Sequence, residues 1–180
     1  MKNSDKKGIT FIEIIVVTSI IMVLAGLLLP ALTRARAKAK KGETLVRMDS
    51  IAAAITLYES DFGSYPPDDT LAGVAGYTGG ESLWYHLGAT FIKGANSPMN
   101  AGPFIDLKAT GVDYAAGAGA NVDFDGDSSA NNAVQTLVDA WGNALNYDCC
   151  PGAHNTSSYD LSSPGPDGAS GTSDDVTNWS

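Results

Sequence analysis

The stretch Gly8-Ile9-Thr10-Phe11-Ile12-Glu13-Ile14-Ile15-Val16-Val17 places one carboxylate near the start of an otherwise uncharged apolar segment that runs to Thr33. An acidic side chain in hydrocarbon costs roughly 2.5 to 3.5 kcal/mol on insertion scales. Because the segment contains no cation of its own, Glu13 predicts a partner supplied from elsewhere. The simplest candidate is a free amino group, created by cleavage of the chain just after Gly8.

Two other interpretations of this N-terminal region remain open. A secretory signal peptide also has a basic start and an apolar middle, and Ala35-Arg36-Ala37 loosely matches its cleavage site. However, the apolar run is longer than is usual for such a peptide, Glu13 interrupts it, and Arg34 and Arg36 crowd the cleavage site. A plain single-span anchor also fits, since about 20 apolar residues cross a bilayer, but it leaves Glu13 unexplained.

Helical signals continue beyond the apolar segment. Apolar side chains recur at Ile51, Ile55, Tyr58 and Phe62, at spacings of four, three and four, with Leu45 and Met48 flanking the same side. This pattern predicts that one face of the helix is covered by the protein core. Gly63 is expected to cap the helix, and the prolines at 66 and 67 prevent its continuation.

The predicted helix therefore runs from Ile9 to Phe62, a length of about 80 Å at 1.5 Å per residue. Pro30 lies in its interior, where proline costs about 3 kcal/mol and frees a backbone carbonyl. One interpretation is that the helix tolerates this residue as a kink.

Charge divides the chain into two parts. Residues 1–53 carry nine Lys or Arg against four acidic residues, whereas residues 54–180 carry two against sixteen, giving +5 and −14, which sum to the net charge of −9. The acidic part argues against binding of nucleic acid, which requires a basic face. A basic cluster follows the apolar segment and is expected to touch anionic headgroups or acidic neighbours, or to be a solvated helix face: Arg34, Arg36, Lys38, Lys40 and Lys41.

Residues 64–180 are rich in Gly, Asp, Asn, Ser and Pro and contain only short periodic runs. The patterns predict a short helix over 81–87, an extended piece over 104–107, and a hairpin that pairs 144–148 with 158–162. Gly88 to Gly126 is expected to be a long structured loop with small elements. Together these residues are enough for one modest soluble domain.

The motifs at both ends of the chain resemble one family. Lys6-Lys7-Gly8 followed by Ile9-Thr10-Phe11-Ile12-Glu13 is similar to the processing site of type IV prepilins and type II secretion pseudopilins. The likeness to major pseudopilins continues, in the order of that family, through Tyr58-x-x-Asp61-x-Gly63-x-Tyr65-Pro66, Asp139-Ala140-Trp141-Gly142-Asn143, Gly165-Pro166-Asp167-Gly168 and Asp175-Val176-x-Asn178-Trp179. It covers the first 66 residues and the last 42 or so. Ile9 departs from the aromatic or Met often found there, and Ala140 from the usual proline.

This resemblance implies an α+β, type IV pilin-like fold. Residues 1–8 would be a leader, 9–33 a transmembrane and assembly helix, and 34–63 an amphipathic helix continuing into the soluble domain. Residues 64–180 would form a small antiparallel β-sheet domain with long loops and a C-terminal calcium loop.

The resemblance also implies a role. Prepilin peptidase would cleave between Gly8 and Ile9, the new N-terminus would be methylated, Glu13 would pair with the Ile9 amine, and Pro30 would mark where the helix loosens. The product would be a structural subunit of the inner membrane, with its domain in the periplasm. It would polymerise as a helical homopolymer into a periplasmic pseudopilus that supports type II protein secretion. Its partners would be the inner-membrane assembly platform and minor pseudopilins.

Two alternative functions remain open, a type IV pilin of a surface filament for adhesion or motility, and a membrane-tethered calcium-dependent binding module. An enzyme is not expected. The chain has no Gly-x-Ser-x-Gly and no phosphate-binding loop, and His86 and His154 lie far apart without a recognisable nucleophile.

The C-terminal loop carries the strongest metal-binding pattern. Asp167, Asp174 and Asp175 place three carboxylates within nine residues, with intervening glycines that let the backbone fold around a point. Calcium takes six to eight oxygen ligands, and the carbonyls of residues 162–164 are candidates for the remainder. The resemblance implies Ca2+ on these three aspartates, and a solvated acidic turn is the alternative. A second acidic run over 123–127 does not fit an EF-hand, since its glycine is misplaced and the closing glutamate is missing.

The only two cysteines are adjacent, at Cys149 and Cys150. They permit a strained vicinal disulfide, free thiols or an intermolecular bond. A zinc site with His154 would have three ligands at an unusual spacing and no visible fourth, so it is not expected.

Overall fold

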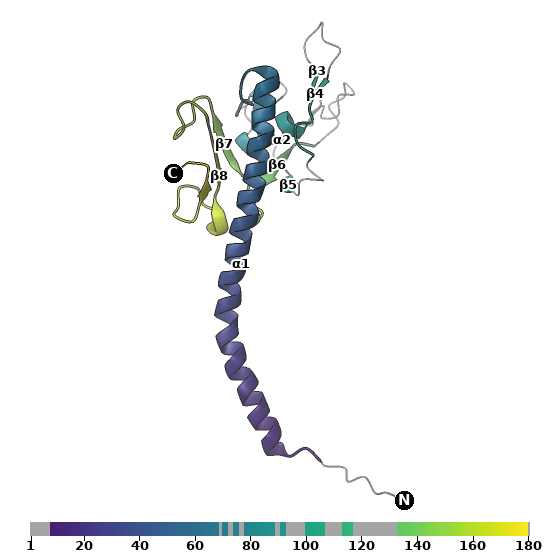
Figure 1. The fold of residues 1–180 in the computed structure, drawn as a ribbon, viewed down its shortest axis with the longest axis vertical. Coiled ribbons are helices and arrows are strands. Elements are labelled where there is room, and N and C mark those ends of the chain that lie inside the picture. The colour runs from purple at the N-terminus through teal and green to yellow at the C-terminus, as the bar shows by residue number, and fades with distance from the viewer. Residues whose placement is uncertain are drawn as a thin grey trace, which may run out of the picture. The chain divides into compact units, whose positions relative to one another are not determined.

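Helix α1 (Phe11–Phe62) is the longest element of the computed structural model, which describes residues 8–68, 70–71, 74–75, 78–88, 91–92, 100–106, 113–116 and 133–179 (Figure 1). The sequence predicts a start at Ile9, but the helix begins two residues later because Thr10 caps it. The Glu13 amide donates to Thr10 Oγ1 (3.3 Å), and the Thr10 amide donates to Glu13 Oε2 (2.9 Å). This reciprocal pair is a capping box, which satisfies two otherwise unpaired amides.

The other end of α1 lies where the sequence predicts it. Gly63 follows Phe62 with φ of +75°, a left-handed conformation that glycine adopts readily, and its amide donates to the Glu59 carbonyl (2.7 Å). Pro30 lies inside the helix, which continues through it.

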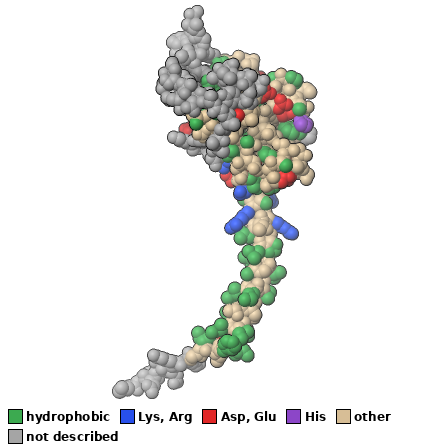
Figure 2. Space-filling model, turned by 180° about the vertical axis from the view of Figure 1, so that it is seen from behind, with side chains coloured by type: hydrophobic (Ala, Val, Ile, Leu, Met, Phe, Trp, Pro, Cys, Tyr) green, Lys and Arg blue, Asp and Glu red, His purple; other side chains and the backbone are tan. Residues whose placement is uncertain are grey.

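The chain divides into two compact units, Met1–Ala39 and Lys40–Ser180. In the described part of the first unit every side chain is exposed, and an 18-residue window of the helix has a mean hydropathy of 2.7. Figure 2 shows these hydrophobic side chains along the helix, followed by Lys and Arg. By length and composition, α1 is able to cross a membrane.

In the second unit α1 buries one face, formed by Thr44, Met48, Ile51, Ala54, Ile55 and Tyr58. The predicted apolar stripe is therefore correct at its centre and wrong at both ends. Leu45 is 43% exposed, because it lies about 100° around the helix from the buried Thr44. Phe62, in the last turn, is 37% exposed, although its ring lies 4.5 Å from that of Tyr58.

Helix α2 (Gly79–Gly88) matches the short helix predicted over 81–87. Its residues from Gly80 to Leu87 are all buried, and it contacts strands β6 and β7. A Cβ at Gly79 would overlap the carbonyl oxygen of Tyr147, and one at Gly80 would lie 2.6 Å from the carbonyl oxygen of Leu145. The first turn of α2 thus rests directly on the backbone of the segment that contains β7.

The larger strand pairings are antiparallel. Strand β5 (Asp113–Ala116) pairs with β6 (Gln135–Val138), and β7 (Asn146–Cys149), β8 (Tyr159–Ser163) and β9 (Val176–Thr177) form a sheet in the order β7-β8-β9. The β7–β8 register, with Tyr147 opposite Leu161, confirms the predicted hairpin.

Two short pairs complete the described strands, β1 (Thr70–Leu71) with β2 (Val74–Ala75) and β3 (Phe91–Ile92) with β4 (Asn100–Ala101). Strands β3, β4 and β5 lie within the predicted loop of 88–126, most of whose remaining residues lie outside the described part of the chain.

The extended piece predicted over 104–107 is wrong where the structure describes it. The amides of Phe104 and Ile105 donate to the carbonyl of Leu87 (2.7 and 3.2 Å), so these residues close the end of α2 instead of joining a sheet.

The core of the second unit lies between α1, α2 and the strands. Its largest fully buried apolar side chains are Ile51, Ile55, Leu83, Leu87, Leu137, Leu145 and Leu161. The fold is α+β, with a long N-terminal helix and a small antiparallel sheet, as predicted from the sequence.

Candidate functional site

The loop between β8 and β9 carries the three aspartates of the predicted calcium site. It begins with a 3-10 helix (η1, Gly165–Asp167) that ends at Gly168, whose φ of +71° is left-handed. The Gly165 amide donates to Ser163 Oγ (3.1 Å), and Asn143 Nδ2 donates to the Gly165 carbonyl (2.7 Å). The start of the loop is therefore attached to the end of β8 and to the turn before β7.

Hydrogen bonds within the loop orient its carboxylates. The Thr172 hydroxyl lies 2.6 Å from Asp174 Oδ1 and 3.1 Å from Asp175 Oδ1, and Asp167 Oδ1 accepts from the Ala169 amide (2.9 Å). The hydrogen bond from Thr172 lowers the pKa of Asp174 below its ordinary value. The ionised form of Asp174 is therefore favoured.

The donor chemistry of the loop suits calcium, because all three candidate side chains offer carboxylate oxygens. The three side chains do not converge on one point in this structure. Over the residues that the structure describes, no three His, Cys, Asp or Glu side chains are grouped closely enough to hold one ion. Asp174 and Asp175 both face Thr172, while Asp167 closes its own turn.

Asp139 connects the loop to the rest of the domain. Its side chain is almost fully buried, with 1% of the residue exposed. Oδ1 accepts from the amides of Trp141 (2.8 Å) and Asn143 (2.9 Å), and Oδ2 accepts from Ser163 Oγ (2.6 Å). One carboxylate thus shapes the turn over 139–143 and holds the end of β8.

Helix α1 binds the same turn from the other side. Arg47 Nη1 donates to the carbonyls of Val138 (3.1 Å) and Asp139 (3.0 Å), and the Ala140 amide donates to Thr44 Oγ1 (3.2 Å). The Arg47 guanidinium also pairs with Glu43 (2.7 Å). A continuous set of hydrogen bonds therefore runs from α1 through the turn to the acidic loop.

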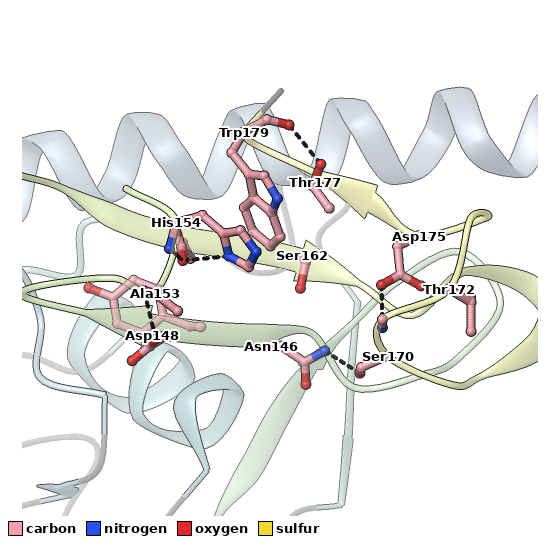
Figure 3. Close-up of a pocket in the computed structure, with 13 residues that line it drawn as sticks. Asn146, Asp148, Ala153, His154, Ser162, Ser170, Thr172, Asp175, Thr177 and Trp179 are labelled. Atoms are coloured by element: carbon pink, nitrogen blue, oxygen red, sulfur yellow. Dashed lines mark hydrogen bonds and ion pairs between the residues drawn. The ribbon is translucent and has the colours of Figure 1, made fainter. Parts of the chain in front are cut away.

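A pocket of about 580 Å³ opens on the β7-β8-β9 sheet (Figure 3). Asn146 and Asp148 line it from β7 and are exposed, whereas Tyr147 between them is buried. The pocket therefore lies on the sheet face opposite the core. Residues of β8, β9 and the two adjoining loops complete its walls.

Aromatic and acidic side chains meet in this pocket. The rings of His154 and Trp179 are stacked, with centroids 4.2 Å apart and planes 10° apart. His154 Nδ1 lies 3.1 Å from Asp160 Oδ2. Burial alone would raise the pKa of Asp160, but hydrogen bonds from the His154 and Asn155 amides and from the His154 ring outweigh it and lower the pKa.

The N-terminal candidates lie together at the start of α1. Gly8 and Ile9 precede the helix, and Glu13 faces back toward them through its hydrogen bonds with the amide and hydroxyl of Thr10 (both 2.9 Å). This local partner was missed in the sequence, although Thr-x-x-Glu ahead of an apolar run is a recognisable capping-box signal. It supplies hydrogen bonds to Glu13 but no positive charge.

Cys149 and Cys150 form a disulfide with each other. The vicinal bond is thus the correct one of the three predicted possibilities, and it leaves no thiolate from either residue for a zinc site with His154. The acidic run over 123–127 lies outside the described residues.

Two connecting residues were not identified as site residues from the sequence. Asp139 opens one of the motifs shared with major pseudopilins, but no role was assigned to it; an aspartate before a turn commonly accepts backbone amides. No role was assigned to Asp160 from the sequence, although its partners His154 and Asn155 lie only six and five residues before it.

Comparison with known proteins gives consistent matches. The family model described as type II secretion system (T2SS), protein G matches residues 128–179, which contain the acidic loop and the pocket. The type II secretion system core protein G of Escherichia coli (strain K12) is 32% identical over 181 residues, covering 99% of this chain and 95% of that protein. The type IV major pilin protein PilE of Neisseria gonorrhoeae is 37% identical over 73 residues, covering 41% of this chain and 44% of that protein.

A solved structure of the major pseudopilin from the type 2 secretion system of enterohaemorrhagic Escherichia coli covers 82% of this chain and 93% of that chain. Its sequence identity is 20% and its TM-score is 0.42.

Proposed function

The chain belongs to the type II secretion system protein G family, and from this membership we propose that it is the structural subunit that polymerises into a periplasmic pseudopilus supporting type II protein secretion. The observation that carries the proposal is the 32% identity that extends over 99% of the chain. An apolar helix with exposed side chains supports it, because such a surface requires lipid or other apolar helices to cover it.

The N-terminal residues have separate roles in this proposal. Prepilin peptidase cuts between Gly8 and Ile9, and the new amine, which is methylated, pairs with Glu13 of a neighbouring subunit. The Thr10 cap supports this role because it presents the Glu13 carboxylate at the helix start. Pro30 allows the helix to loosen within the filament.

The proposed location is the inner membrane, with α1 as a single span and the acidic unit in the periplasm. The assembly platform of that membrane and minor pseudopilins are the proposed partners. A surface type IV pilin is the second candidate, favoured by similarity to pilins such as PilE, but that match covers only 41% of this chain. A membrane-tethered calcium-dependent binding module is the third, and it would not polymerise.

We also propose that Asp167, Asp174 and Asp175 bind Ca2+. Oxygen-only donors, the ionised state favoured for Asp174, and the left-handed glycines at 168 and 171 support this assignment. Binding would draw carboxylates from their present hydrogen-bond partners in the loop toward one ion.

Processing and assembly are tested together in cells that carry the secretion machinery. Mass spectrometry of the mature protein should give Ile9 as its first residue, and replacement of Gly8 should leave the longer form. Glu13→Leu should lower filament yield in electron micrographs while the melting temperature of the domain stays unchanged. The matched control is Thr18→Val, which removes a hydroxyl bonded only to helix carbonyls.

Three outcomes would count against these assignments. A mature terminus near Lys38 would support an ordinary signal peptide. Normal filaments from Glu13→Leu would rule out the pairing with a neighbour's amine. Complete processing without filaments would favour the tethered binding module.

A further inference from the structure

The pocket on the β7-β8-β9 sheet has an acidic surface that the calcium loop explains only in part, because it supplies Asp175 but not Asp148 or Asp160. Three carboxylates line it, those of Asp148, Asp160 and Asp175, and His154 is the only side chain in its lining that can carry positive charge. His154 is already paired with Asp160. The pocket therefore favours a cationic occupant.

Asp148 is the carboxylate most available to such an occupant. It is exposed and accepts one hydrogen bond within the described residues, from the Ala153 amide (3.1 Å). Asp160, in contrast, is buried and accepts from His154 and Asn155. Asp175 accepts from Gly171 and Thr172.

The stacked rings beside Asp148 refine the kind of cation. A guanidinium is planar, pairs with carboxylates through two N–H groups and stacks on aromatic faces, whereas an ammonium is a compact, strongly hydrated charge. Trp179 and His154 present aromatic surface in the same pocket as Asp148. This combination suits arginine better than lysine.

The chain itself contains a segment of matching charge. Residues 34–41 include two arginines and three lysines, all of them exposed, and none has an ion-pair partner in the part of the chain that the structure describes (Figure 2). Arg34, Lys38 and Lys41 are spaced by four and three residues and share one helix face.

We propose that the pocket receives the basic segment 34–41 of a second copy of this chain, with an arginine guanidinium on Asp148. The contact rests on the proposed polymerisation, which brings many copies side by side. The two parts of the chain carry opposite net charge, +5 over residues 1–53 and −14 over residues 54–180. Their attraction would bind one subunit to the next. Each subunit contributes one pocket and one basic segment, so the contact repeats along a filament.

A photo-crosslinker placed in the pocket tests the partner directly. Ala153 is exposed and lines the pocket, so benzoylphenylalanine at this position in the full chain should give a crosslinked dimer in cells that assemble filaments. Digestion after glutamate leaves residues 14–43 as one peptide, and this peptide should carry the crosslink. The control position is Thr156, which is exposed but does not line the pocket.

Charge variants test the chemistry of the contact. Asp148→Asn keeps an acceptor for the Ala153 amide and removes only the charge, so it should lower the dimer yield about two- to fivefold. Asp148→Lys should lower the dimer yield further, and so should a double variant that carries both Arg34→Glu and Arg36→Glu. Combining Asp148→Lys with the two arginine reversals should restore the dimer, and raised salt should weaken the wild-type crosslink.

Several results would overturn the proposal. One is a crosslink from position 153 to another protein or to a different segment of the second copy. Another is an intramolecular product without any dimer. The third is failure of the charge exchange to restore the dimer. Its failure is distinguishable from failure of the proposed function, because filaments are scored separately by electron microscopy. Filaments without the crosslink would refute the pocket contact alone, and the crosslink without filaments would refute the function alone.

Discussion

Replacement of Asp139 by alanine should strongly destabilise the second unit, Lys40–Ser180. The carboxylate accepts three hydrogen bonds, from the amides of Trp141 and Asn143 and from the hydroxyl of Ser163, at 2.6 to 2.9 Å. A buried donor left without an acceptor costs about 1 to 3 kcal/mol. The two amides belong to partly exposed residues and can regain water, so each is assigned about 1 kcal/mol, while Ser163 is fully buried.

The expected loss is therefore about 3 to 5 kcal/mol. For a unit of this size, 1 kcal/mol corresponds to roughly 3 °C, so the melting temperature should fall by roughly 9 to 15 °C. Intrinsic fluorescence of the full chain in detergent measures this well, because Trp141 lies within the turn and Trp179 lies beyond the loop. Asp139→Asn, which keeps one acceptor oxygen, should lose less.

Asp148→Ala provides the matched control, since it also removes an aspartate that binds a backbone amide but lies on the surface. We expect a change within about 0.5 kcal/mol for this variant. If the free energies of unfolding of Asp139→Ala and Asp148→Ala differ by less than about 1 kcal/mol, Asp139 is not the link between α1, the turn and the acidic loop.

The remaining predictions concern the metal, pH and packing. Calcium at about 100 times its Kd should add roughly 2.7 kcal/mol to the free energy of unfolding, so chelation should lower the melting temperature by several degrees. Asp167→Ala and Asp175→Ala should each abolish this effect of chelation, whereas Asp125→Ala should not. Magnesium should substitute poorly for calcium. No effect of chelation on melting would leave the loop as acidic surface. Burial holds the pKa of His86 below its ordinary value. As the pH falls, the imidazole is therefore protonated in the unfolded chain before it is protonated in the folded chain. The free energy of unfolding should consequently decrease below about pH 6.5. Thermal melts between pH 7 and 5.5 should show this slope in the wild type and less of it in His86→Leu, and equal slopes would contradict the assignment. Ile51→Ala, at a position with no exposed surface, should cost about 2 to 5 kcal/mol in denaturant unfolding, and a loss below 1 kcal/mol would mean that α1 is not the main wall of the core.

The features that could be predicted from sequence are those encoded by neighbouring residues. The end of α1 follows from an apolar period that stops at Phe62 and a glycine that adopts a positive φ. The β7–β8 hairpin follows from two short runs close together in the chain. The segment at Phe104 was mispredicted, because its amides bind Leu87, a partner 17 positions away that no local pattern indicates.

The same distinction applies to the candidate site. The aspartates at 167, 174 and 175 are recognisable as a group, since they lie close together in the sequence. The directions of their side chains depend on Thr172 and on backbone amides, which composition does not specify. The link from Asp139 to Ser163 spans 24 positions, and that from Arg47 to Asp139 spans 92, so only the folded chain reveals that they form one connected set.

The contact of α2 with the backbone around β7 limits how this chain can vary over evolution. Any side chain at Gly79 would meet the carbonyl oxygen of Tyr147, and any at Gly80 would meet that of Leu145. A backbone atom cannot move aside as the tip of a flexible side chain can. Descendants that keep this helix at this distance must therefore retain both glycines, while a lineage that loses one must shift the whole helix and replace the side chains that α2 buries.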